Sequence, residues 1–178
     1  MEFSAAREFS RQFASLCLIA ALSLACGLAL NWFRVAPLPL LYRTPEQRLE
    51  RQLSELAKNP PFQITDQETI GLRDFQRAVA DRRTVVLDAR PFPFFKEGHV
   101  PGALNLSREN FARDYRRLQA ALRDAKERPI VVYCSGGSCH DSKLVAGALL
   151  SLGFANVKVF TGGWEVWKDA RLPISHQP

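Results

Sequence analysis

The chain has 178 residues, of which 47% are hydrophobic and 24% charged, and its 24 Lys and Arg against 18 Asp and Glu give a formal net charge of +6. This length allows one ordinary domain and a smaller additional part. The apolar content, together with only 10 Gly and 11 Pro, excludes a disordered, collagen-like or low-complexity chain. The basic residues are interleaved with acidic ones and form no basic stripe with aromatic residues between them, so no nucleic-acid partner is predicted. Four cysteines in a chain of this length do not make a disulfide scaffold.

An uncharged apolar segment over residues 14–33 follows an N-terminal tail over residues 1–13. In a helix, roughly 20 residues cross a hydrocarbon core of about 30 Å, so we predict a single-pass transmembrane helix. A cleaved signal peptide is the alternative, although its apolar region is usually only about 7 to 15 residues long. Arginines flank both ends of the segment, so the side of the membrane is left open. Cys17 and Cys26 lie within the segment and are interpreted as apolar filler.

Residues 34–61 are predicted to form a linker that contains one short amphipathic helix. Prolines interrupt the first part of this linker, and Thr44 followed by Pro45 then provides a typical helix start. Leucines recur at helical spacing, namely Leu49, Leu53 and Leu56. We expect this helix to lie on the surface of the domain or of the membrane.

Residues 62–178 show short apolar runs that alternate with helical patterns, which is typical of βαβ units around a mostly parallel sheet. The predicted helices cover about residues 72–80, 108–126 and 142–152, and the predicted strands cover residues 84–87, 130–133 and 157–160. Functional groups in such folds follow the carboxyl ends of the strands. Asp88, Cys134 and the pair Gly162-Gly163 each follow a predicted strand, so we expect their loops to converge on one rim.

The segment Cys134-Ser135-Gly136-Gly137-Ser138-Cys139 connects a predicted buried strand to a helix that begins near Asp141. Glycine and serine allow the backbone to curl so that successive amides point at one sulfur or one anion, and the N-terminus of the following helix adds partial positive charge. Both effects favour the thiolate of Cys134, which is therefore a candidate nucleophile. The alternative is an inert buried cysteine, which would need no glycine-rich loop behind it.

The chain resembles the rhodanese-like domain family over about residues 64–173. The resemblance rests on four ordered elements, namely Asp88-Ala89-Arg90 after a strand, the turn Gly98-His99-Val100-Pro101-Gly102-Ala103, Tyr133-Cys134, and Gly162-Gly163 followed by Trp167 and Pro173. It implies a three-layer α/β/α fold and a sulfurtransferase in which Cys134 carries a persulfide. The residues that would bind the substrate and cradle its sulfur with backbone amides are Ser135, Gly136, Gly137, Ser138 and Cys139.

Two positions of this loop depart from the family pattern. Family members that use thiosulfate often carry Arg or Lys directly after the cysteine and Arg five positions after it, where this chain has Ser135 and Cys139. We therefore predict weak thiosulfate activity and a preference for a thiol, a persulfide or a protein-bound sulfur donor. Related phosphatases place Arg six residues beyond the cysteine to bind phosphate, and His140 at that position argues against phosphatase or arsenate reductase activity.

Cys139 allows two interpretations. Its thiol could attack a Cys134 persulfide, release sulfide and leave a disulfide, provided that the two Cα atoms approach within about 7 Å. Alternatively, Cys139 only fills the place of the usual arginine. A metal site of Cys134, Cys139 and His140 is disfavoured because the sequence has no second Cys or His cluster, and we predict neither a metal nor a cofactor.

Further residues are given supporting or neutral roles. Asp88 and Arg90 are expected to brace the loop through an ion pair, and His99 is expected to be a turn residue rather than a general base. Trp164 and Trp167 are interpreted as packing residues.

An apolar insertion follows Arg90. We expect its phenylalanines, Phe92, Phe94 and Phe95, to line the approach to Cys134 or to pack against the membrane-proximal helix. Arg108 and Lys143 are interpreted as solvated charges.

The sequence thus predicts a membrane-anchored sulfurtransferase that passes sulfane sulfur through Cys134. A dithiol redox protein that cycles Cys134 and Cys139, and a non-catalytic binding module, are the alternatives. The expected reaction partner is a small sulfur donor or a protein-bound persulfide. The chain is expected to contact the membrane through residues 14–33. An anchored domain also allows another membrane protein as a partner.

Overall fold

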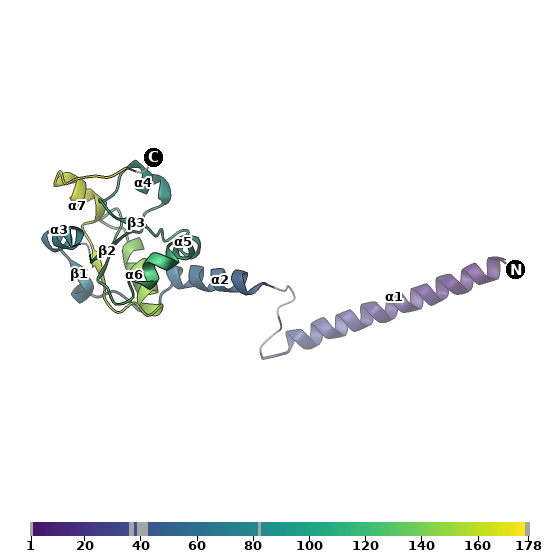
Figure 1. Ribbon diagram of the computed structural model, residues 1–178. Helices are drawn as coiled ribbons and strands as arrows, with labels where there is room; N and C mark the ends of the chain where they lie inside the picture. The colour runs from purple at the N-terminus through teal and green to yellow at the C-terminus, as the bar shows by residue number, and fades with distance from the viewer. Residues whose placement is uncertain (1, 36–37, 39–42, 82, 177–178) are drawn as a thin grey trace. The chain divides into compact units, whose positions relative to one another are not determined.

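The computed structural model describes residues 2–35, 38, 43–81 and 83–176, and for residues 2–10 it describes the backbone only. Contacts divide the chain into two compact units, Met1–Arg43 and Thr44–Pro178 (Figure 1). The first unit contains the long helix α1, and the second contains every strand and the remaining helices of the described chain.

Helix α1 (Glu2–Trp32) includes the predicted membrane segment except for its last residue. The part Arg11–Trp32 is long and apolar enough to cross a membrane by length and composition, and none of it is buried inside the protein. Its leucines are exposed, for example Leu16, Leu22 and Leu30. This exposure is expected of a helix whose apolar side chains need a non-aqueous environment. The helix therefore remains a candidate membrane anchor.

The second unit is built on a sheet of five parallel strands in the order β1-β5-β4-β2-β3. The strands are β1 (Thr69–Ile70), β2 (Val85–Asp88), β3 (Leu104–Asn105), β4 (Ile130–Tyr133) and β5 (Val157–Phe160). Within the sheet Asp88 lies opposite Tyr133, and Tyr133 lies opposite Phe160. The carboxyl ends of the three longest strands therefore meet at one edge, from which the loops after Asp88, Tyr133 and Phe160 leave.

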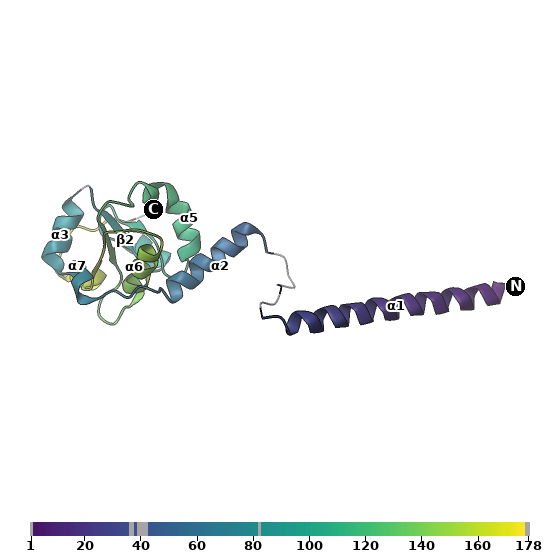
Figure 2. The ribbon, with the colours of Figure 1, turned by 90° about the horizontal axis from the view of Figure 1, so that it is seen from below.

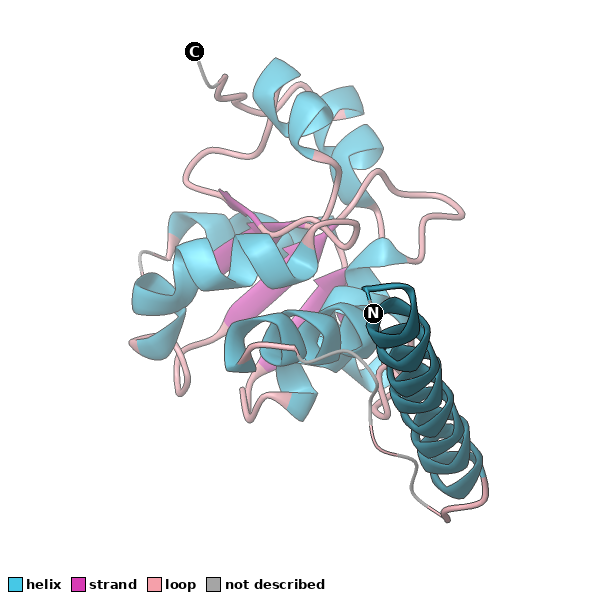
Figure 3. Ribbon diagram, turned by 90° about the vertical axis from the view of Figure 1, so that its right-hand side faces the viewer, coloured by secondary structure: helices cyan, strands magenta, loops and turns pink. Residues whose placement is uncertain are grey.

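Helices cover both faces of this sheet, which confirms the predicted three-layer α/β/α fold (Figures 2 and 3). One face carries α3 (Leu72–Ala80), α4 (Phe92–Glu97) and α7 (Gly163–Asp169), and the other carries α2 (Pro45–Lys58), α5 (Phe111–Arg123) and α6 (Asp141–Ser151). A short 3₁₀ turn, Asp66–Glu68, precedes β1.

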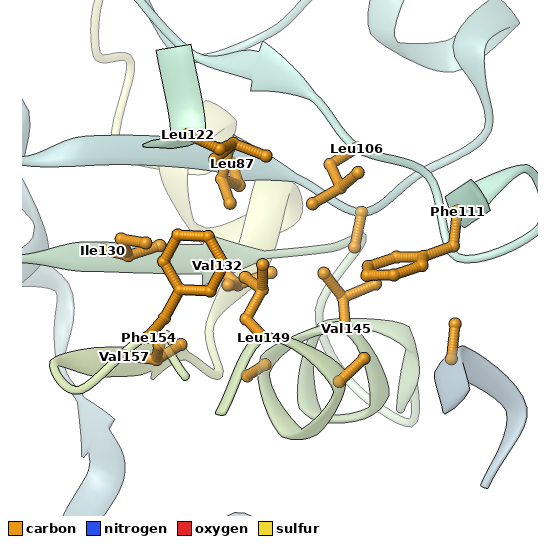
Figure 4. Packing of buried hydrophobic residues seen from close by; sticks show 14 of the residues in the cluster. Leu87, Leu106, Phe111, Leu122, Ile130, Val132, Val145, Leu149, Phe154 and Val157 are labelled. Carbon is orange, nitrogen blue, oxygen red and sulfur yellow. The ribbon is translucent and has the colours of Figure 1, made fainter. Parts of the chain in front are cut away.

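Alternation along the strands sends side chains to two separate cores. The core under α5 and α6 contains Leu87, Ile130, Val132, Val157 and Val159 (Figure 4). The core under α3 and α7 contains Val86, Val131, Tyr133 and Phe160. Because side chains point to opposite faces in turn, Cys134 continues the series of Ile130 and Val132 and belongs to the core on the α6 side.

Helix α2 is part of this domain. Thr44 caps it, since its side chain accepts a hydrogen bond from Gln47 while the Gln47 side chain accepts one from the Thr44 amide. Leu53 and Ala57 are buried in the core where α2 packs on α5 and α6. The compact unit therefore begins at Thr44, whereas the sequence placed this helix in a linker and began the domain at residue 62.

The bounds of β2 and α6 differ from the predicted ones by one residue at each end, and those of α5 by about three. Helix α5 begins at Phe111 rather than near residue 108, because the preceding residues form a turn in which Ser107 Oγ donates to Asp114 Oδ2 at 2.6 Å. The insertion after Arg90 contains the helix α4, which begins after Pro91 at Phe92. The two-residue strands β1 and β3 and this short helix had no periodic signal in the sequence.

Candidate functional site

Cys134 lies directly after β4 with only 2% of its surface exposed. The structure joins it to Cys139 in a disulfide, with 6.5 Å between the two Cα atoms. Ser142 Oγ lies 3.4 Å from Cys134 Sγ. The geometric condition for an exchange between the two cysteines is therefore met.

The loop between the two cysteines is curled as its glycines suggest. Gly136 and Gly137 have φ values of 109° and 58°, in the left-handed region that favours glycine. A turn closes the loop, because the Cys139 amide donates to the Gly136 carbonyl at 3.1 Å. Within the described part of the chain, the amides of residues 135–138 donate no hydrogen bond. Four backbone amides of the cysteine loop therefore have no hydrogen-bond acceptor among the described residues and remain available as donors.

The start of α7 packs against the cysteine loop and donates hydrogen bonds to its carbonyl groups. The Trp164 amide donates to the Cys134 carbonyl at 2.7 Å, and the Glu165 amide donates to the Ser135 carbonyl at 2.9 Å. Gly163 has a φ of 61°, and a Cβ atom on it would lie 2.4 Å from the Gly136 nitrogen and 2.5 Å from the Cys134 carbonyl oxygen. Only glycine permits this approach, so the structure brings the predicted pair Gly162-Gly163 against the cysteine loop.

Asp88, Arg90 and Tyr133 form a buried network behind the loops. Asp88 is fully buried and Arg90 is 4% exposed. Arg90 Nη2 donates to Asp88 Oδ2 at 2.6 Å and to the Gly98 carbonyl at 2.7 Å, and the Tyr133 hydroxyl donates to the same carboxylate oxygen at 2.7 Å. The network thus connects the ends of β2 and β4 with the turn that begins at Gly98.

The Tyr133 hydroxyl stays protonated in this network. Burial, followed by the negative charge of Asp88 and its hydrogen bond, raises the pKa of Tyr133 well above its usual value. The hydroxyl also accepts a hydrogen bond of 3.1 Å from the Val100 amide. Tyr133 therefore acts as a fixed donor to Asp88 and as an acceptor for the turn.

The remaining polar and aromatic candidates have partners within these supporting loops. The Arg90 guanidinium lies 4.6 Å from the centre of the Trp164 ring. His99 Nδ1 is 2.8 Å from the Phe95 carbonyl, and its ring stacks on Phe95. Trp167 Nε1 donates to the Pro173 carbonyl at 2.9 Å. These contacts fit the expected bracing and packing roles, which stay predictions until variants are tested.

Two pockets flank the cysteine loop. One, of about 330 Å³, lies on the Ser135 side and is lined by Arg90, Phe94, Glu97, Gly98, Ser135, Trp164, Glu165 and Lys168. The other, of about 490 Å³, lies on the His140 side and is lined by Lys58, Asn59, Pro60, Phe62, Gln63, Ile64, His140, Lys143 and Leu144. Of the three phenylalanines in the predicted insertion, Phe94 lines the first pocket and Phe95 is buried in the core under α3 and α7.

Sequence reasoning missed one residue of this site and misjudged another. Ser142, in the first turn of α6, is 2% exposed and contacts Cys134. Arg108, interpreted as a solvated charge, has a buried Nε atom and lies beside Asp141. A helix that begins near Asp141 directs its first turn towards the preceding strand end, which is the signal that could have identified Ser142.

Comparison with known proteins supports the resemblance. The family model described as the rhodanese-like domain matches residues 72–170. A thiosulfate sulfurtransferase GlpE from Pseudomonas fluorescens is 35% identical over 92 residues, which cover 52% of this chain and 77% of that protein. An adenylyltransferase and sulfurtransferase UBA4 from Candida albicans is 29% identical over 109 residues, which cover 60% of this chain but only 24% of that protein.

Solved structures support the fold. The solution structure of the rhodanese-like domain of the Alr3790 protein from Anabaena superposes with a TM-score of 0.52 at 23% identity. The match covers 62% of this chain and 80% of that domain. At this identity the likeness concerns the arrangement of strands and helices.

Proposed function

Because this chain belongs to the rhodanese-like domain family, and relatives of it are named as sulfurtransferases, we propose that it transfers sulfane sulfur through a persulfide on Cys134. One observation carries this proposal. Cys134 lies at a buried strand end beneath a loop whose four free amides can stabilise a negatively charged outer sulfur.

The proposed first step loads the enzyme. The Cys134 thiolate attacks the outer sulfur of a persulfide donor, the donor's S–S bond breaks, and the donor leaves as a thiolate. A new S–S bond then holds that sulfur on Cys134. The charge of the outer sulfur is taken up by the amides of the loop, and the sulfur passes to an acceptor thiolate by the same exchange in reverse.

Cys139 supports a second outcome for the loaded enzyme. Its thiolate attacks Cys134 Sγ, the bond to the outer sulfur breaks, and hydrosulfide leaves with the electron pair of that bond. The sulfane sulfur is thereby reduced to sulfide, while the two thiols are oxidised to the Cys134–Cys139 disulfide. Two equivalents of a thiol reductant then restore both cysteines. The disulfide in the structure and the Cα separation of 6.5 Å support this branch.

The same disulfide favours a second candidate function, a dithiol redox protein that cycles Cys134 and Cys139 without sulfur transfer.

The donors predicted for the sulfurtransferase are thiols, persulfides or protein-bound sulfur rather than thiosulfate. Thiosulfate is a dianion, and the loop has the uncharged residues Ser135 and Cys139 at the two positions where a cation would attract it.

Trapping of the persulfide tests these functions against each other. The full chain, Cys134→Ser and Cys139→Ser would be treated with glutathione persulfide, 3-mercaptopyruvate or thiosulfate and analysed by peptide mass. An adduct of one sulfur atom, about 32 Da, on Cys134 supports sulfur transfer. No sulfur adduct on Cys134 in Cys139→Ser with any donor, together with a Cys134–Cys139 disulfide as the only modification of the full chain, contradicts it and supports the redox function.

The membrane anchor is the remaining part of the proposal. The exposed apolar surface of Arg11–Trp32 supports a spanning helix. Leu22→Arg would place a charge near the middle of this span at a cost of about 3 kcal/mol, so it should shift the protein from the membrane fraction to the soluble fraction after an alkaline wash. Leu22→Val is the matched control and should stay in the membrane fraction. If the unmodified chain is released by the alkaline wash, the anchor is refuted.

A further inference from the structure

Arg108 lies at the same carboxyl edge of the sheet as Cys134. The Arg108 amide donates to the Ala89 carbonyl at 3.2 Å, and the Ala89 amide donates to the Tyr133 carbonyl at 2.8 Å. Arg108 follows β3, Ala89 follows β2, and Tyr133 ends β4 directly before Cys134. Two backbone hydrogen bonds therefore place Arg108 two strand ends away from the cysteine.

The Arg108 side chain extends towards the start of α6, the helix that follows the cysteine loop. Its Nε lies 3.5 Å from Asp141 Oδ1, where Asp141 is the first residue of α6. The next residue, Ser142, has its hydroxyl 3.4 Å from Cys134 Sγ. The guanidinium therefore lies at the first residue of α6, one residue before the serine that contacts the reactive sulfur.

The Arg108 guanidinium has a donor without an acceptor among the described residues. Arg108 Nε is buried and donates no hydrogen bond within the described residues, because its distance to Asp141 is long for such a bond. The Arg108 side chain as a whole is 39% exposed, so a ligand at the rim can reach its remaining donors. A buried, unpartnered donor on a cation is costly unless something binds to it.

The charges around the loop indicate which side an anion would approach. Glu165 Oε2 lies near the loop on the α7 side, where a Cβ atom added to Gly136 would be 3.7 Å from it. This carboxylate disfavours an anion directly at the loop, although Lys168 lines the same pocket. The loop itself carries no cation at Ser135 or Cys139. On the opposite side, Lys58 and Lys143 line the pocket next to His140. Arg108 is the cation that pairs with Asp141 at the start of α6, next to the residue that contacts Cys134 Sγ.

From this arrangement we propose that Arg108 binds the anionic group of the sulfur donor, which is a thiol persulfide that carries a carboxylate near its reacting sulfur. The planar fork of the guanidinium suits a carboxylate. This inference rests on the proposed function for its substrate class. The anion site itself can be tested without any sulfur transfer.

Two alkylating reagents that differ in charge test the site. Iodoacetate and iodoacetamide react with a thiolate by the same displacement, but only iodoacetate is an anion. The reduced full chain, carrying Cys139→Ser so that no disulfide forms, would be alkylated and the rate at Cys134 followed by peptide mass. The measured quantity is the ratio of the iodoacetate rate to the iodoacetamide rate.

In this background Arg108→Gln should lower the ratio about threefold to tenfold, the size expected for one charge at a half-exposed site. Arg108→Lys should retain most of the ratio. Arg123→Gln, an exposed arginine at the far end of α5, removes the same charge elsewhere and should leave the ratio unchanged.

Asp141→Asn distinguishes an Arg108 that binds anions from an Arg108 that only forms a structural ion pair with Asp141. If Arg108 binds anions, freeing it from Asp141 should raise the ratio, opposite to the effect of Arg108→Gln. An unchanged ratio in Arg108→Gln, or shifts of both variants in the same direction, overturns the proposal.

Persulfide donors of opposite charge complete the test. Glutathione persulfide carries carboxylates, whereas cysteamine persulfide carries an ammonium group, and both react through the same S–S bond. Arg108→Gln should raise KM for the first about threefold to tenfold and leave KM for the second unchanged. If no donor loads Cys134 although the alkylation ratio shifts as expected, the sulfurtransferase proposal fails and the anion site stands. If donors load but the alkylation ratio is unchanged, the anion site fails alone.

Discussion

The Tyr133 hydroxyl donates a hydrogen bond of 2.7 Å to Asp88 Oδ2, and the two residues lie opposite each other at the ends of adjacent parallel strands. Tyr133 directly precedes the candidate nucleophile, Cys134. The contact therefore connects the backbone that positions Cys134 with the Asp88–Arg90 ion pair.

Removal of this hydroxyl should destabilise the domain. Tyr133→Phe leaves a buried carboxylate with one donor fewer and the Val100 amide without its acceptor, so the free energy of unfolding should fall by about 2 kcal/mol. Urea denaturation would measure the change. The control is Tyr115→Phe, because the Tyr115 hydroxyl forms no hydrogen bond with any described residue. Equal effects of the two substitutions would contradict this role.

The same tyrosine predicts a pH dependence. Its folded-state pKa is raised, so the folded state retains the proton more strongly than the unfolded state, in which tyrosine ionises near pH 10. The stability due to Tyr133 is therefore complete below about pH 10 and is lost as the pH rises beyond it. Denaturation curves between about pH 8 and pH 11 should show a steeper alkaline loss in the unmodified chain than in Tyr133→Phe.

Gly163 should tolerate no side chain. Gly163→Ala introduces a Cβ that overlaps the backbone of Gly136 and Cys134, so it should displace the cysteine loop, lower persulfide loading at least about tenfold and cost more than about 2 kcal/mol of stability. Gly153→Ala is the matched control. Gly153 also has a positive φ, 86°, but a Cβ there would meet only Lys126 Nζ at 3.9 Å. Its cost should stay near 1 to 2 kcal/mol, roughly that of a left-handed residue alone, with loading unchanged.

Cys139→Ser should prolong the life of a Cys134 persulfide at least about tenfold, because the neighbouring thiolate that would expel hydrosulfide is gone. A sulfide-selective probe should accordingly detect less hydrosulfide during single turnover. Cys17→Ser, in helix α1, changes a cysteine that the structure leaves free and should alter neither quantity. Persulfide lifetimes that agree between the full chain and Cys139→Ser would assign Cys139 a packing role.

Helix α2 should contribute to the stability of the domain. Leu53 is 4% exposed in the core, whereas Leu49 on the same helix is 48% exposed. Leu53→Ala should therefore cost about 2 to 5 kcal/mol, and Leu49→Ala should change the free energy of unfolding by less than about 0.5 kcal/mol. Similar losses in the two variants would mean that α2 is not packed as described.

The sequence predicted the elements that a periodic pattern specifies. The buried strands β4 and β5 and the amphipathic helix α3 have the predicted bounds, because each is long enough to show its period. The edge strands β1 and β3 contain two residues each and could not be recognised in this way. For α2 the sequence left the domain and the membrane as alternative surfaces, because an amphipathic pattern does not say which surface the apolar face covers, and the structure packs α2 on the domain.

The site was predictable where it is local in the chain. Cys134, the glycine loop and Cys139 are contiguous, so their neighbourhood followed from the spacing alone. Arg108 and Asp141 are far apart in the chain and meet only because β3 and the start of α6 share one edge of the fold. The roles of these residues in a reaction stay predictions that the variants above test.

The strand order has a consequence for how the domain meets other proteins. Both outer strands of the sheet, β1 and β3, are only two residues long, so each edge offers few free backbone groups to a strand from another chain. The sheet is thereby protected from edge-to-edge aggregation. A protein that delivers or receives sulfur would instead have to dock over the loops at the carboxyl edge, with side chains rather than an added strand determining which proteins fit.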